Sequence, residues 1–393
     1  MTSEDVARPE RSRPRLNNAA TTAKIWDLPT RLFHWLLVLS VAISAKTGFF
    51  GPANSLDWHV WSGYAIGVLI VWRLIWGLFG SEFSRLDRLF GALRRLPEHI
   101  AGLVRLSPKH YLGHNPAGSL MILALICVLF AILVTGLVVL GGVEKQGPLV
   151  GMTGYDIGHL AKGVHQILAY LLMVMILGHL LGVLTEVVLL RVPLVRGMVT
   201  GRLPVPADVA RGGWRGARPA MALAGSLAAA AAIGIPLFLF ASLPAHGVPA
   251  PVPANSVYAK ECGACHWSFH PSLLPRASWK LLMSRLDRHF GEDASLSAAA
   301  AAEISSYLDA NAAETADTEP ANRLREVSTT EPDRITRTRF WQRVHGDLPA
   351  ALFGSPAIKS KVNCAACHRD ALSGRFDDQA IDIPLTLKSG DTN

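Results

Sequence analysis

The chain has 393 residues, of which 50% are apolar and only 17% are charged. This composition argues against a purely soluble protein and indicates a membrane protein long enough for more than one domain. The net charge of +8 is unevenly placed, since residues 1–250 carry 22 Lys/Arg against 12 Asp/Glu and residues 251–393 carry 16 against 18. The basic side chains therefore belong to the membrane part, which excludes a nucleic-acid-binding surface as their explanation.

Five apolar stretches are long enough to cross a bilayer, and each must be helical because lipid offers no partners to free backbone groups. The predicted spans are residues 32–50, 58–79, 119–140, 160–190 and 220–243. The basic N-terminus and the AISA sequence at 42–45 also permit a cleaved signal peptide. We favour an uncleaved first span, because cleavage would remove His34 and the motif around it.

Basic residues in the connecting segments predict the orientation. The N-terminal tail, residues 81–118 and residues 191–218 each carry six Lys/Arg, whereas residues 51–57 carry none and residues 141–159 carry only Lys145. This asymmetry predicts a cytoplasmic N-terminus in a bacterial inner membrane. After five crossings, the C-terminal part is expected in the periplasm.

The predicted architecture is an all-α membrane protein, in which a four-helix bundle and a fifth transmembrane helix precede a mostly helical, loop-rich extracytoplasmic domain. Its predicted parts are a basic tail (1–23), a membrane domain (24–203), a loop with the fifth helix (204–243), a Pro-rich linker (244–256) and a periplasmic domain (257–393). In the last of these, helical periodicity covers 279–290 and 295–310, and residues 311–335 are expected to form a long connection.

Two histidines lie in the fourth span, His165 and His179, fourteen residues apart. Fourteen residues are two heptads, so both imidazoles point to nearly the same face, roughly 21 Å apart along a helix. Ionisable groups within a membrane helix are costly and usually mark a function. This pattern predicts half of the ligand set for two b-type haems, although two core histidines bonded to neighbouring helices are the alternative.

Two further histidines lie at matching depths, His34 at the cytoplasmic start of the first span and His59 at the outer start of the second. Depth pairs His34 with His179 and His59 with His165. An iron held by two imidazoles has no open position, so it suits electron transfer better than ligand chemistry.

Other polar groups at or near the membrane receive other interpretations. Arg73 and Lys46 either neutralise haem propionates or extend to the headgroups. The loop histidines His99, His110 and His114 are expected at the surface or at helix caps. His159 lies on the opposite side of its helix from His165. The lone cysteine, Cys127, is expected to be a small core residue.

Several stretches carry a family resemblance: WDLPTRLFHW (26–35), HVWSGY (59–64), RLIWGLFGS (73–81), GHNPAG (113–118), HQILAYLLMVMILGH (165–179) and VRGMVTGR (195–202). Over about residues 24–203 the chain resembles the b-type cytochrome subunits of Ni,Fe-hydrogenases and related bacterial di-haem cytochromes b. The resemblance implies a four-helix fold whose haem ligands are His34, His59, His165 and His179, the same four that depth selects.

Outside the membrane part, C-x-x-C-H occurs twice, as CGACH at 262–266 and CAACH at 364–368. This is the attachment pattern of c-type haem, in which two thiols add to the haem vinyl groups and the adjacent histidine binds the iron. One such motif alone would also fit a zinc or redox cysteine pair, but two on the predicted outer side favour haem c. The predicted site residues are Cys262, Cys265 and His266, and Cys364, Cys367 and His368.

Four more side chains are candidates for a sixth iron ligand in this domain. His289 lies 23 residues after His266, and His345 lies 23 residues before His368. The others are Met283 and His270, and His270 follows His266 by only four residues, too few to reach round the haem, so a surface role is expected for it.

This domain also resembles a family, through ECGACHWSFHPSLLPRASW (261–279), HFGEDASL (289–296), RITRTRFWQRVH (334–345) and the second CAACH. Over about residues 258–380 it is similar to the bacterial di-haem cytochromes c, which are electron-transfer modules, some of which pass electrons to a haem protein with an open site. Both haems in that family have two histidine ligands, which implies His289 and His345 as distal ligands. Which histidine serves which haem stays open.

The function favoured by these features is transmembrane electron transfer through two non-covalent b haems and two covalent c haems. The electrons would pass between the quinone pool, or a membrane or periplasmic dehydrogenase, and a periplasmic cytochrome or other haem protein, as in a quinol–cytochrome c type oxidoreductase. One alternative is a di-haem peroxidase-like enzyme, against which the two spare histidines argue. Another is a membrane anchor or relay subunit of a hydrogenase-like complex, although a fused cytochrome c domain departs from that family. No catalytic residue and no nucleic-acid motif is predicted.

Overall fold

The computed structural model describes residues 21–52, 55–105, 111, 113–188, 191–205, 215–244, 247–248 and 256–384. Among these, five helices are long and apolar enough to cross a membrane: α1 (Leu28–Phe50), α2 (Leu56–Phe79), α5 (Pro116–Gly142), α6 (Tyr155–Val188) and α9 (Pro219–Ala241). The five predicted spans are therefore confirmed, with their ends displaced by a few residues.

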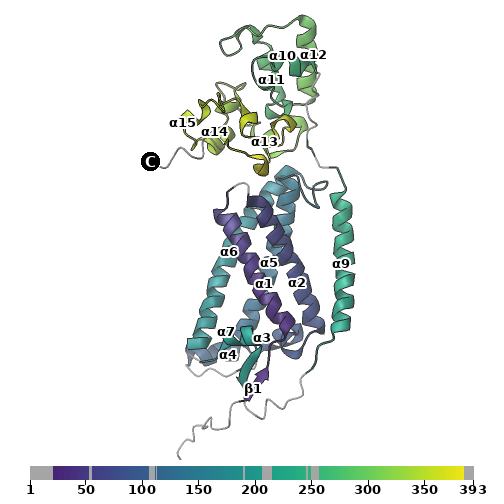
Figure 1. The fold of residues 1–393 in the computed structure, drawn as a ribbon, viewed down its shortest axis with the longest axis vertical. Helices are drawn as coiled ribbons and strands as arrows, with labels where there is room; N and C mark the ends of the chain where they lie inside the picture. The colour runs from purple at the N-terminus through teal and green to yellow at the C-terminus, as the bar shows by residue number, and fades with distance from the viewer. Residues whose placement is uncertain are drawn as a thin grey trace, which may run out of the picture. The chain divides into compact units, whose positions relative to one another are not determined.

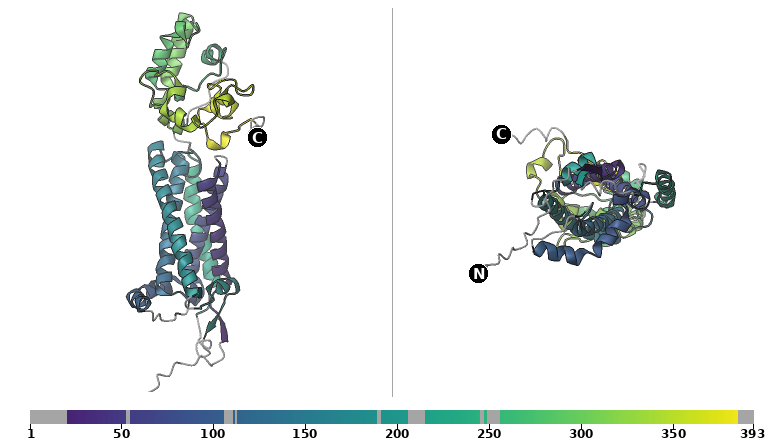
Figure 2. Two further views of the ribbon diagram at one scale, coloured as in Figure 1. Left: turned by 90° about the vertical axis from the view of Figure 1, so that its left-hand side faces the viewer. Right: turned by 90° about the horizontal axis from the view of Figure 1, so that it is seen from below.

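The chain forms two compact units, and each of the five long helices contributes one segment to each unit. The first unit lies within Met1–Val38, Val68–Cys127 and Leu172–Ala228, and the second within Leu39–Gly67, Val128–Leu171 and Ala229–Asn393. Within each unit the segments of α1, α2, α5 and α6 lie side by side (Figures 1 and 2). Of the five spans α2 is the most enclosed, whereas the others present most of their apolar side chains outward, as helices covered by lipid do.

The helix starts in the first unit follow from capping residues that the sequence motifs supply. Asn115 precedes α5, its Oδ1 accepts from the N–H of Gly118 at 2.6 Å, and Pro116 follows at the first helical position. Asp27 precedes α1 and its carboxylate accepts from the N–H of Thr30 at 2.9 Å and from Trp76 Nε1 at 3.0 Å. Asp27 thereby joins the start of α1 to the end of α2.

The first unit also contains a short antiparallel sheet that the sequence did not predict. Strand β1 (Thr21–Lys24) pairs with β2 (Arg202–Val205), with Thr21 opposite Val205 and Lys24 opposite Arg202. Gly201, at φ +80°, ends α7 (Leu194–Thr200) and turns the chain into β2. The remaining described helices of this unit are η2 (Glu82–Ser84), α3 (Leu86–Leu93) and α4 (Leu96–Val104).

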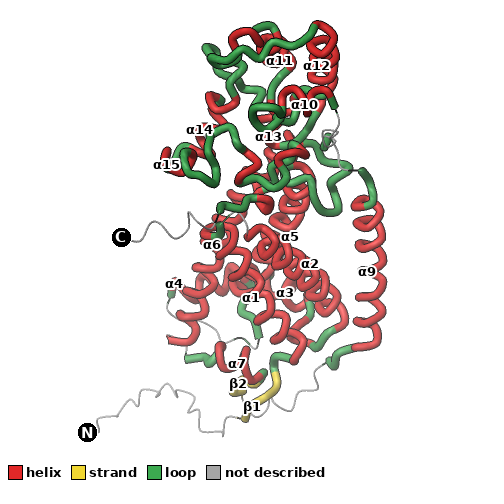
Figure 3. Tube along the Cα trace, turned by 45° about the horizontal axis from the view of Figure 1, so that its top comes forward, coloured by secondary structure: helices red, strands yellow, loops and turns green. Residues whose placement is uncertain are grey.

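In the second unit, the chain after α9 forms short helices joined by long loops (Figure 3). The α-helices are α10 (Val257–Cys262), α11 (Arg276–Met283), α12 (Ala298–Ala310), α13 (Glu319–Arg323), α14 (Arg339–His345) and α15 (Ala350–Phe353). Single 3-10 turns are η3 (Pro271–Leu273), η4 (Leu286–Arg288), η5 (Ala313–Thr315), η6 (Ile335–Arg337), η7 (Cys364–Ala366), η8 (Ala371–Ser373) and η9 (Asp378–Ala380). The predicted helix at 279–290 is shorter than expected, and the expected connection at 311–335 contains η5 and α13.

The core of this C-terminal part is built on α10, α11 and α12. Its fully enclosed side chains are Tyr258, Leu274, Trp279, Ile304, Leu308 and Ala312. Trp279 Nε1 donates to the carbonyl of Pro271 at 2.7 Å, so the indole is buried with its polar atom satisfied. Cys262 of the first C-x-x-C-H motif packs against this core, so burial of these apolar side chains helps to fix that motif.

Candidate haem-binding sites

In the second unit, His59 of α2 and His165 of α6 face each other with their ring centroids 6.1 Å apart. A metal–imidazole bond is about 2 Å long, and the ring centre lies roughly 1 Å beyond the nitrogen, so two imidazoles on opposite sides of one iron have centres about 6 Å apart. The separation of these rings therefore fits a single iron between them, as depth in the sequence predicted.

The Nδ1 atom of His59 is held by the neighbouring helix α1. It lies 3.1 Å from the carbonyl oxygen of Ser44 and 3.3 Å from the hydroxyl of Thr47. A carbonyl only accepts, so Nδ1 must carry the proton, and the Thr47 hydroxyl uses its own proton on the carbonyl of Ile43 at 2.8 Å. This arrangement fixes the tautomer and leaves the Nε2 lone pair of His59 for a metal.

The same arrangement recurs between α5 and α6. His165 Nδ1 lies 3.1 Å from the carbonyl oxygen of Ile132 and 3.1 Å from the Thr135 hydroxyl, which donates to the carbonyl of Ala131 at 2.8 Å. In α1 and in α5 alike, the accepting threonine stands three residues after the accepting carbonyl. Both rings are thus oriented by an identical set of backbone and hydroxyl oxygens.

A glycine follows each of these threonines and lies against the histidine ring. A Cβ atom added at Gly48 would lie 3.0 Å from Cε1 of His59, and one at Gly136 would lie 3.2 Å from Cε1 of His165. The glycines therefore let each imidazole approach the helix backbone closely enough to hydrogen-bond to it. The sequence analysis missed these residues, although two Thr-Gly dipeptides in the first and third predicted spans were a visible signal.

In the first unit, His34 of α1 and His179 of α6 are close enough to interact electrostatically. Within the described part of the chain, the buried Nδ1 of His34 has no hydrogen-bond partner. His114 interacts with both histidines and packs on Trp26, with ring centroids 4.5 Å apart. The predicted pairing of His34 with His179 is thus compatible with the fold. His114, which was expected at the surface or at a helix cap, is a neighbour of the pair.

Charge and burial around this pair keep His114 neutral. Burial, followed by the positive charge of Arg73, lowers the pKa of His114 to about 3. Arg73 is only 4% exposed and donates to the carbonyl of Ser84 at 2.9 Å. Arg73 therefore remains a candidate partner for a haem propionate, whereas Lys46 is exposed on α1.

Other assignments made from the sequence are corrected or lie outside the described residues. His99 is buried beside Tyr111 rather than at the surface, and His159 is exposed and stacks on the ring of Tyr155. Cys127 is exposed on α5 instead of lying in the core, because its side of the helix faces away from the bundle. His110 lies outside the described residues.

In the C-terminal part, each motif histidine faces one of the two candidate distal histidines. The ring centroids of His266 and His289 are 6.0 Å apart, and those of His345 and His368 are 6.1 Å apart. Both separations again fit one iron between two imidazoles. The geometry thus pairs His289 with the first motif and His345 with the second, a choice that equal sequence spacings left open.

Two of these four rings are oriented by a backbone carbonyl, as the membrane pair is. His266 Nδ1 lies 2.7 Å from the carbonyl oxygen of Trp267, and His345 Nδ1 lies 3.1 Å from that of Trp341, one turn earlier on α14. Burial lowers the pKa of His289, His345 and His368 below its ordinary value, so the neutral, metal-binding form prevails at pH 7.

The motif cysteines lie in turns that present the adjacent histidine. The N–H of His368 donates to the carbonyl of Cys364 at 2.9 Å, which closes the CAACH turn, and Cys262 ends α10. Among the described residues none of the four motif cysteines forms a disulfide. Burial raises the pKa of the Cys364 thiol to about 12 and that of Cys262 to about 11.

His270 and Met283 have structural roles in this domain. His270 is 2% exposed, contrary to the surface role expected, and its Nδ1 accepts from the N–H of Ser272 at 3.2 Å. It packs so closely on Gly374 that a Cβ there would lie 2.6 Å from its Nδ1. Met283 packs against the apolar core.

Within the described part of the chain no group of three or more His, Cys, Asp or Glu suits a bare metal ion.

Two protein families match separate parts of the chain. Residues 25–201 match the family described as "Prokaryotic cytochrome b561", and residues 258–376 match the family described as "Dihaem cytochrome c". The first match contains the four membrane histidines, and the second contains both C-x-x-C-H motifs with His289 and His345.

Curated relatives of the membrane part are similar but incomplete matches. The chain is 27% identical over 123 residues to the "Probable Ni/Fe-hydrogenase B-type cytochrome subunit" of Azotobacter vinelandii, which is 25% of this chain and 51% of that protein. It is 24% identical over 210 residues to the protein of the same name from Cupriavidus necator, which is 45% of this chain and 85% of that protein. The chain thus spans about half the length of the Azotobacter protein.

Solved structures similar to the C-terminal part are dihaem cytochromes c. The one from Rhodobacter sphaeroides is 40% identical, covers 32% of this chain and 100% of its own, and gives a TM-score of 0.28. The one from Shewanella baltica is 31% identical, covers 34% of this chain and 96% of its own, and gives a TM-score of 0.27.

Proposed function

We propose that this chain carries electrons across a membrane between the quinone pool and a periplasmic electron carrier. The proposal rests on its two parts, a cytochrome b561 domain and a dihaem cytochrome c domain. The b561 domain binds haem b, the C-terminal domain binds two haem c, and the five spans make a multi-pass membrane protein. The number of b haems, their ligands, the electron partners and the orientation belong to the proposal.

One observation carries it: three histidine pairs in one chain have ring centroids 6.0 to 6.1 Å apart. We assign two b haems, the first held by His34 and His179 and the second by His59 and His165. We assign the two c haems to Cys262, Cys265, His266 and His289, and to Cys364, Cys367, His368 and His345. When bound, these haems would supply reversible one-electron chemistry, and two histidines per iron would leave no position for a further ligand.

The protein residues around these sites do the remaining work. Ser44, Ile132 and the two threonines hold the His59 and His165 rings in one tautomer and one orientation, so little rearrangement accompanies electron transfer. Arg73 is buried and interacts electrostatically with His114, a neighbour of His34 and His179, so it provides a fixed positive charge suited to a propionate. Apolar spans exclude water from the membrane sites.

We further propose a cytoplasmic N-terminus and a periplasmic C-terminal domain in the bacterial inner membrane, from the Lys/Arg distribution. The proposed parts are those expected from the sequence, with a membrane domain over 24–203 and a periplasmic domain over 257–393. A periplasmic location suits the c domain, since its two attachment motifs need reduced thiols and haem outside the cytoplasm.

A second candidate function is favoured by the names of the curated relatives, which are hydrogenase cytochrome subunits. In that role the chain relays electrons for a hydrogenase-like or other dehydrogenase subunit bound to it. Mild detergent extraction followed by size-exclusion chromatography tests this, because a catalytic subunit that co-elutes stoichiometrically with the haem supports the relay role over the quinone-linked one.

A pyridine haemochrome assay of the purified chain tests the haem assignment. The expected result is two b and two c haems per chain, and a different ratio removes at least one of the assigned ligand pairs. Reduction of both haem types by a quinol in proteoliposomes, with carbon monoxide leaving the reduced spectrum unchanged, is expected for an electron carrier. Strong carbon monoxide binding by the unmutated protein would instead indicate a peroxidase-like open iron.

A further inference from the structure

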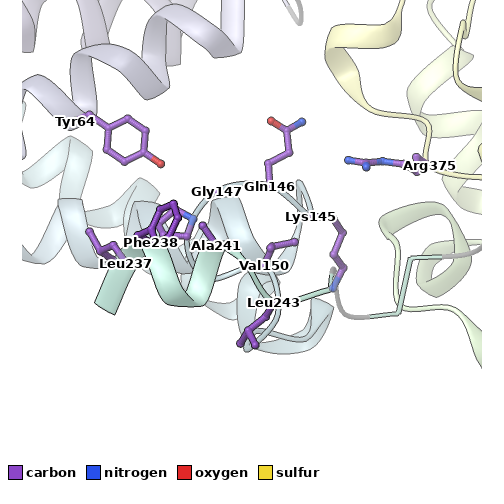
Figure 4. A pocket seen from close by; sticks show the side chains of 11 residues that line it. Tyr64, Lys145, Gln146, Gly147, Val150, Leu237, Phe238, Ala241, Leu243 and Arg375 are labelled. Carbon is purple, nitrogen blue, oxygen red and sulfur yellow. The ribbon is translucent and has the colours of Figure 1, made fainter. Parts of the chain in front are cut away.

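A cavity of about 650 Å³ lies in the second unit, where α2, the α5–α6 loop and the end of α9 meet. Figure 4 shows the side chains around it, among them Tyr64 of α2, Gln146 of the loop, Phe238 and Ala241 of α9, and Arg375. This volume is within the range of sites that bind small organic molecules.

One wall of the cavity is apolar and belongs to a membrane span. Leu237, Phe238 and Ala241 stand in the last turns of α9, and the Phe238 side chain is 72% exposed. Because α9 is one of the five apolar spans, this exposed face lies where lipid covers the helix. A molecule in the cavity therefore has an apolar exit along α9.

The opposite side of the cavity offers hydrogen-bond donors. The phenol of Tyr64 points into the space beside Gly147, and the guanidinium of Arg375 points toward it from the other side, with the Gln146 amide between them (Figure 4). Arg375 Nε is buried and has no hydrogen-bond partner among the described residues. A buried donor without a partner costs free energy that a ligand acceptor would recover.

The charges nearby are already paired, which bears on the kind of ligand. Lys145 Nζ lies 2.8 Å from Asp317, and Arg375 Nη2 lies 2.9 Å from Asp377. An anionic phosphate would have to compete with these carboxylates for the Lys145 and Arg375 side chains. A neutral carbonyl or hydroxyl group needs only the hydrogen-bond donors that the two ion pairs do not use. The cavity thus favours a neutral ring with oxygen substituents and an apolar tail.

The cavity shares helix α2 and the α5–α6 connection with the His59–His165 pair. Tyr64 follows His59 on α2 by five residues, which is about 7.5 Å of helical rise. The loop that supplies Gln146 connects α5, which orients His165, to α6, which carries it.

We propose that this cavity binds the headgroup of a membrane quinone, with the ring against α9, its oxygens on Tyr64, Gln146 and Arg375, and its tail along the outer face of α9. This inference rests on the proposed quinone-linked function and gives it a location. The site draws on α9 and on the C-terminal domain, both of which lie outside the region matched by the cytochrome b561 family.

Equilibrium binding of 2-heptyl-4-hydroxyquinoline N-oxide, a fluorescent quinone analogue quenched on binding, tests the cavity in the full-length haem-loaded protein. Ala241→Trp fills the cavity, and Leu239→Trp is the matched control, since Leu239 is exposed on the same helix and does not line the cavity. Ala241→Trp is expected to weaken binding at least tenfold, with Leu239→Trp within twofold of the unmutated protein. The milder Tyr64→Phe and Gln146→Leu substitutions are expected to weaken binding three- to tenfold each, with unchanged haem b spectra showing intact folding.

The outcomes separate the cavity from the function. Equal binding in all four variants overturns the cavity as the site, while quinol reduction of the unmutated haems would still support the function. Loss of binding in Ala241→Trp alongside haems that no quinol reduces supports the cavity and overturns the quinone-linked function. If Ala241→Trp loses only a co-purified phospholipid and keeps the analogue, the cavity is a lipid site and the proposal is wrong.

Discussion

The Nζ atom of Lys145 lies 2.8 Å from Oδ2 of Asp317, and the same oxygen accepts from the N–H of Tyr155 at 2.9 Å. Tyr155 is the first residue of α6, so the carboxylate also caps that helix. The N–H of Asp317 donates to the carbonyl of Gly247 at 2.8 Å. One aspartate thereby joins the α5–α6 loop, the start of α6 and the segment that enters α13.

Asp317→Asn is expected to lower the free energy of unfolding by about 1–3 kcal/mol, because it leaves the buried ammonium of Lys145 without a charged partner. The carboxylate itself is partly exposed, which keeps the loss below that of a fully buried pair. Thermal unfolding followed by haem absorbance measures the effect. Asp309→Asn, which breaks an exposed pair with Lys280, is the control and is expected to change stability by less than about 0.5 kcal/mol. Equal effects of the two substitutions would contradict the role given to Asp317.

Thr135→Val is expected to weaken haem b retention about tenfold, since it removes one of the two oxygens that orient His165. The expected loss of haem b retention is at the low end of the range for hydrogen-bond partners of metal-binding histidines, because the Ile132 carbonyl still accepts from His165 Nδ1. Haem b occupancy after purification, and its recovery in haemin titration, measure it. Thr185→Val on α6 is the control, because that hydroxyl bonds only to the carbonyl of Leu181 four residues earlier. Unchanged retention in Thr135→Val would remove the threonine from the site.

Gly136→Val is expected to lower haem b occupancy more strongly than Thr135→Val, because its side chain would displace the His165 ring from the α5 backbone. Gly163→Val on α6 is the matched control, since nothing lies within 4 Å of a Cβ placed there. The haem b to haem c ratio is the measurement, and c haem serves as the internal standard. Equal haem b occupancy in the two variants would show that haem binding does not need the close contact between the α5 backbone and the His165 ring.

His345→Ala is expected to convert one c haem to a high-spin, carbon monoxide-binding form while both c haems stay covalently attached, because His345 is the partner facing His368. Optical and EPR spectra of the ferric protein measure the spin state. His159→Ala is the control, since that ring is exposed and stacks on Tyr155. A fully low-spin His345→Ala protein would require another ligand to the second c haem.

Glu144→Gln is expected to stabilise the protein by about 1–3 kcal/mol at pH 8 and to have no effect near pH 4. Burial raises the pKa of Glu144 to about 7; Lys162 opposes this shift, and Asp378, Glu319 and Asp377 add to it. The folded protein therefore holds a proton that the unfolded chain releases between about pH 4.5 and 7, so ionisation of Glu144 lowers stability as the pH rises. Unfolding temperatures across this range check it, with exposed Glu303→Gln on α12 as the control. A stabilisation that does not depend on pH would contradict the assignment.

Hydropathy and spacing predicted the parts of the fold that depend on one segment at a time. The five spans follow from apolar length, and the pairing of His59 with His165 follows from depth along two spans. The contact between Lys145 and Asp317 joins residues far apart in the chain, and no local pattern marks it. The pairing of β1 with β2 is also long-range. Strands of four residues are too short for an alternating apolar pattern to be recognised in the sequence.

Burial of polar side chains was the main error in the sequence analysis. His99 was expected at the surface or at a helix cap and His270 at the surface, yet both are buried. His114, also expected at the surface or at a cap, is half-buried and packs on Trp26. The distal histidines of the c domain could be named but not paired, since both stand 23 residues from a motif histidine. Only the fold brings His289 to His266 and His345 to His368.

The matching sets of carbonyl, threonine and glycine on α1 and α5 have a consequence for reactivity. Exchange of the α1–α2 pair for the α5–α6 pair leaves the accepting oxygens around His59 and His165 unchanged, so the two rings have equivalent surroundings. Gas-binding and peroxide-cleaving haems depend on two chemically different sides of the ring. A haem held between His59 and His165 would meet equivalent groups on both sides, which would suit electron transfer better than the release of one histidine to a substrate.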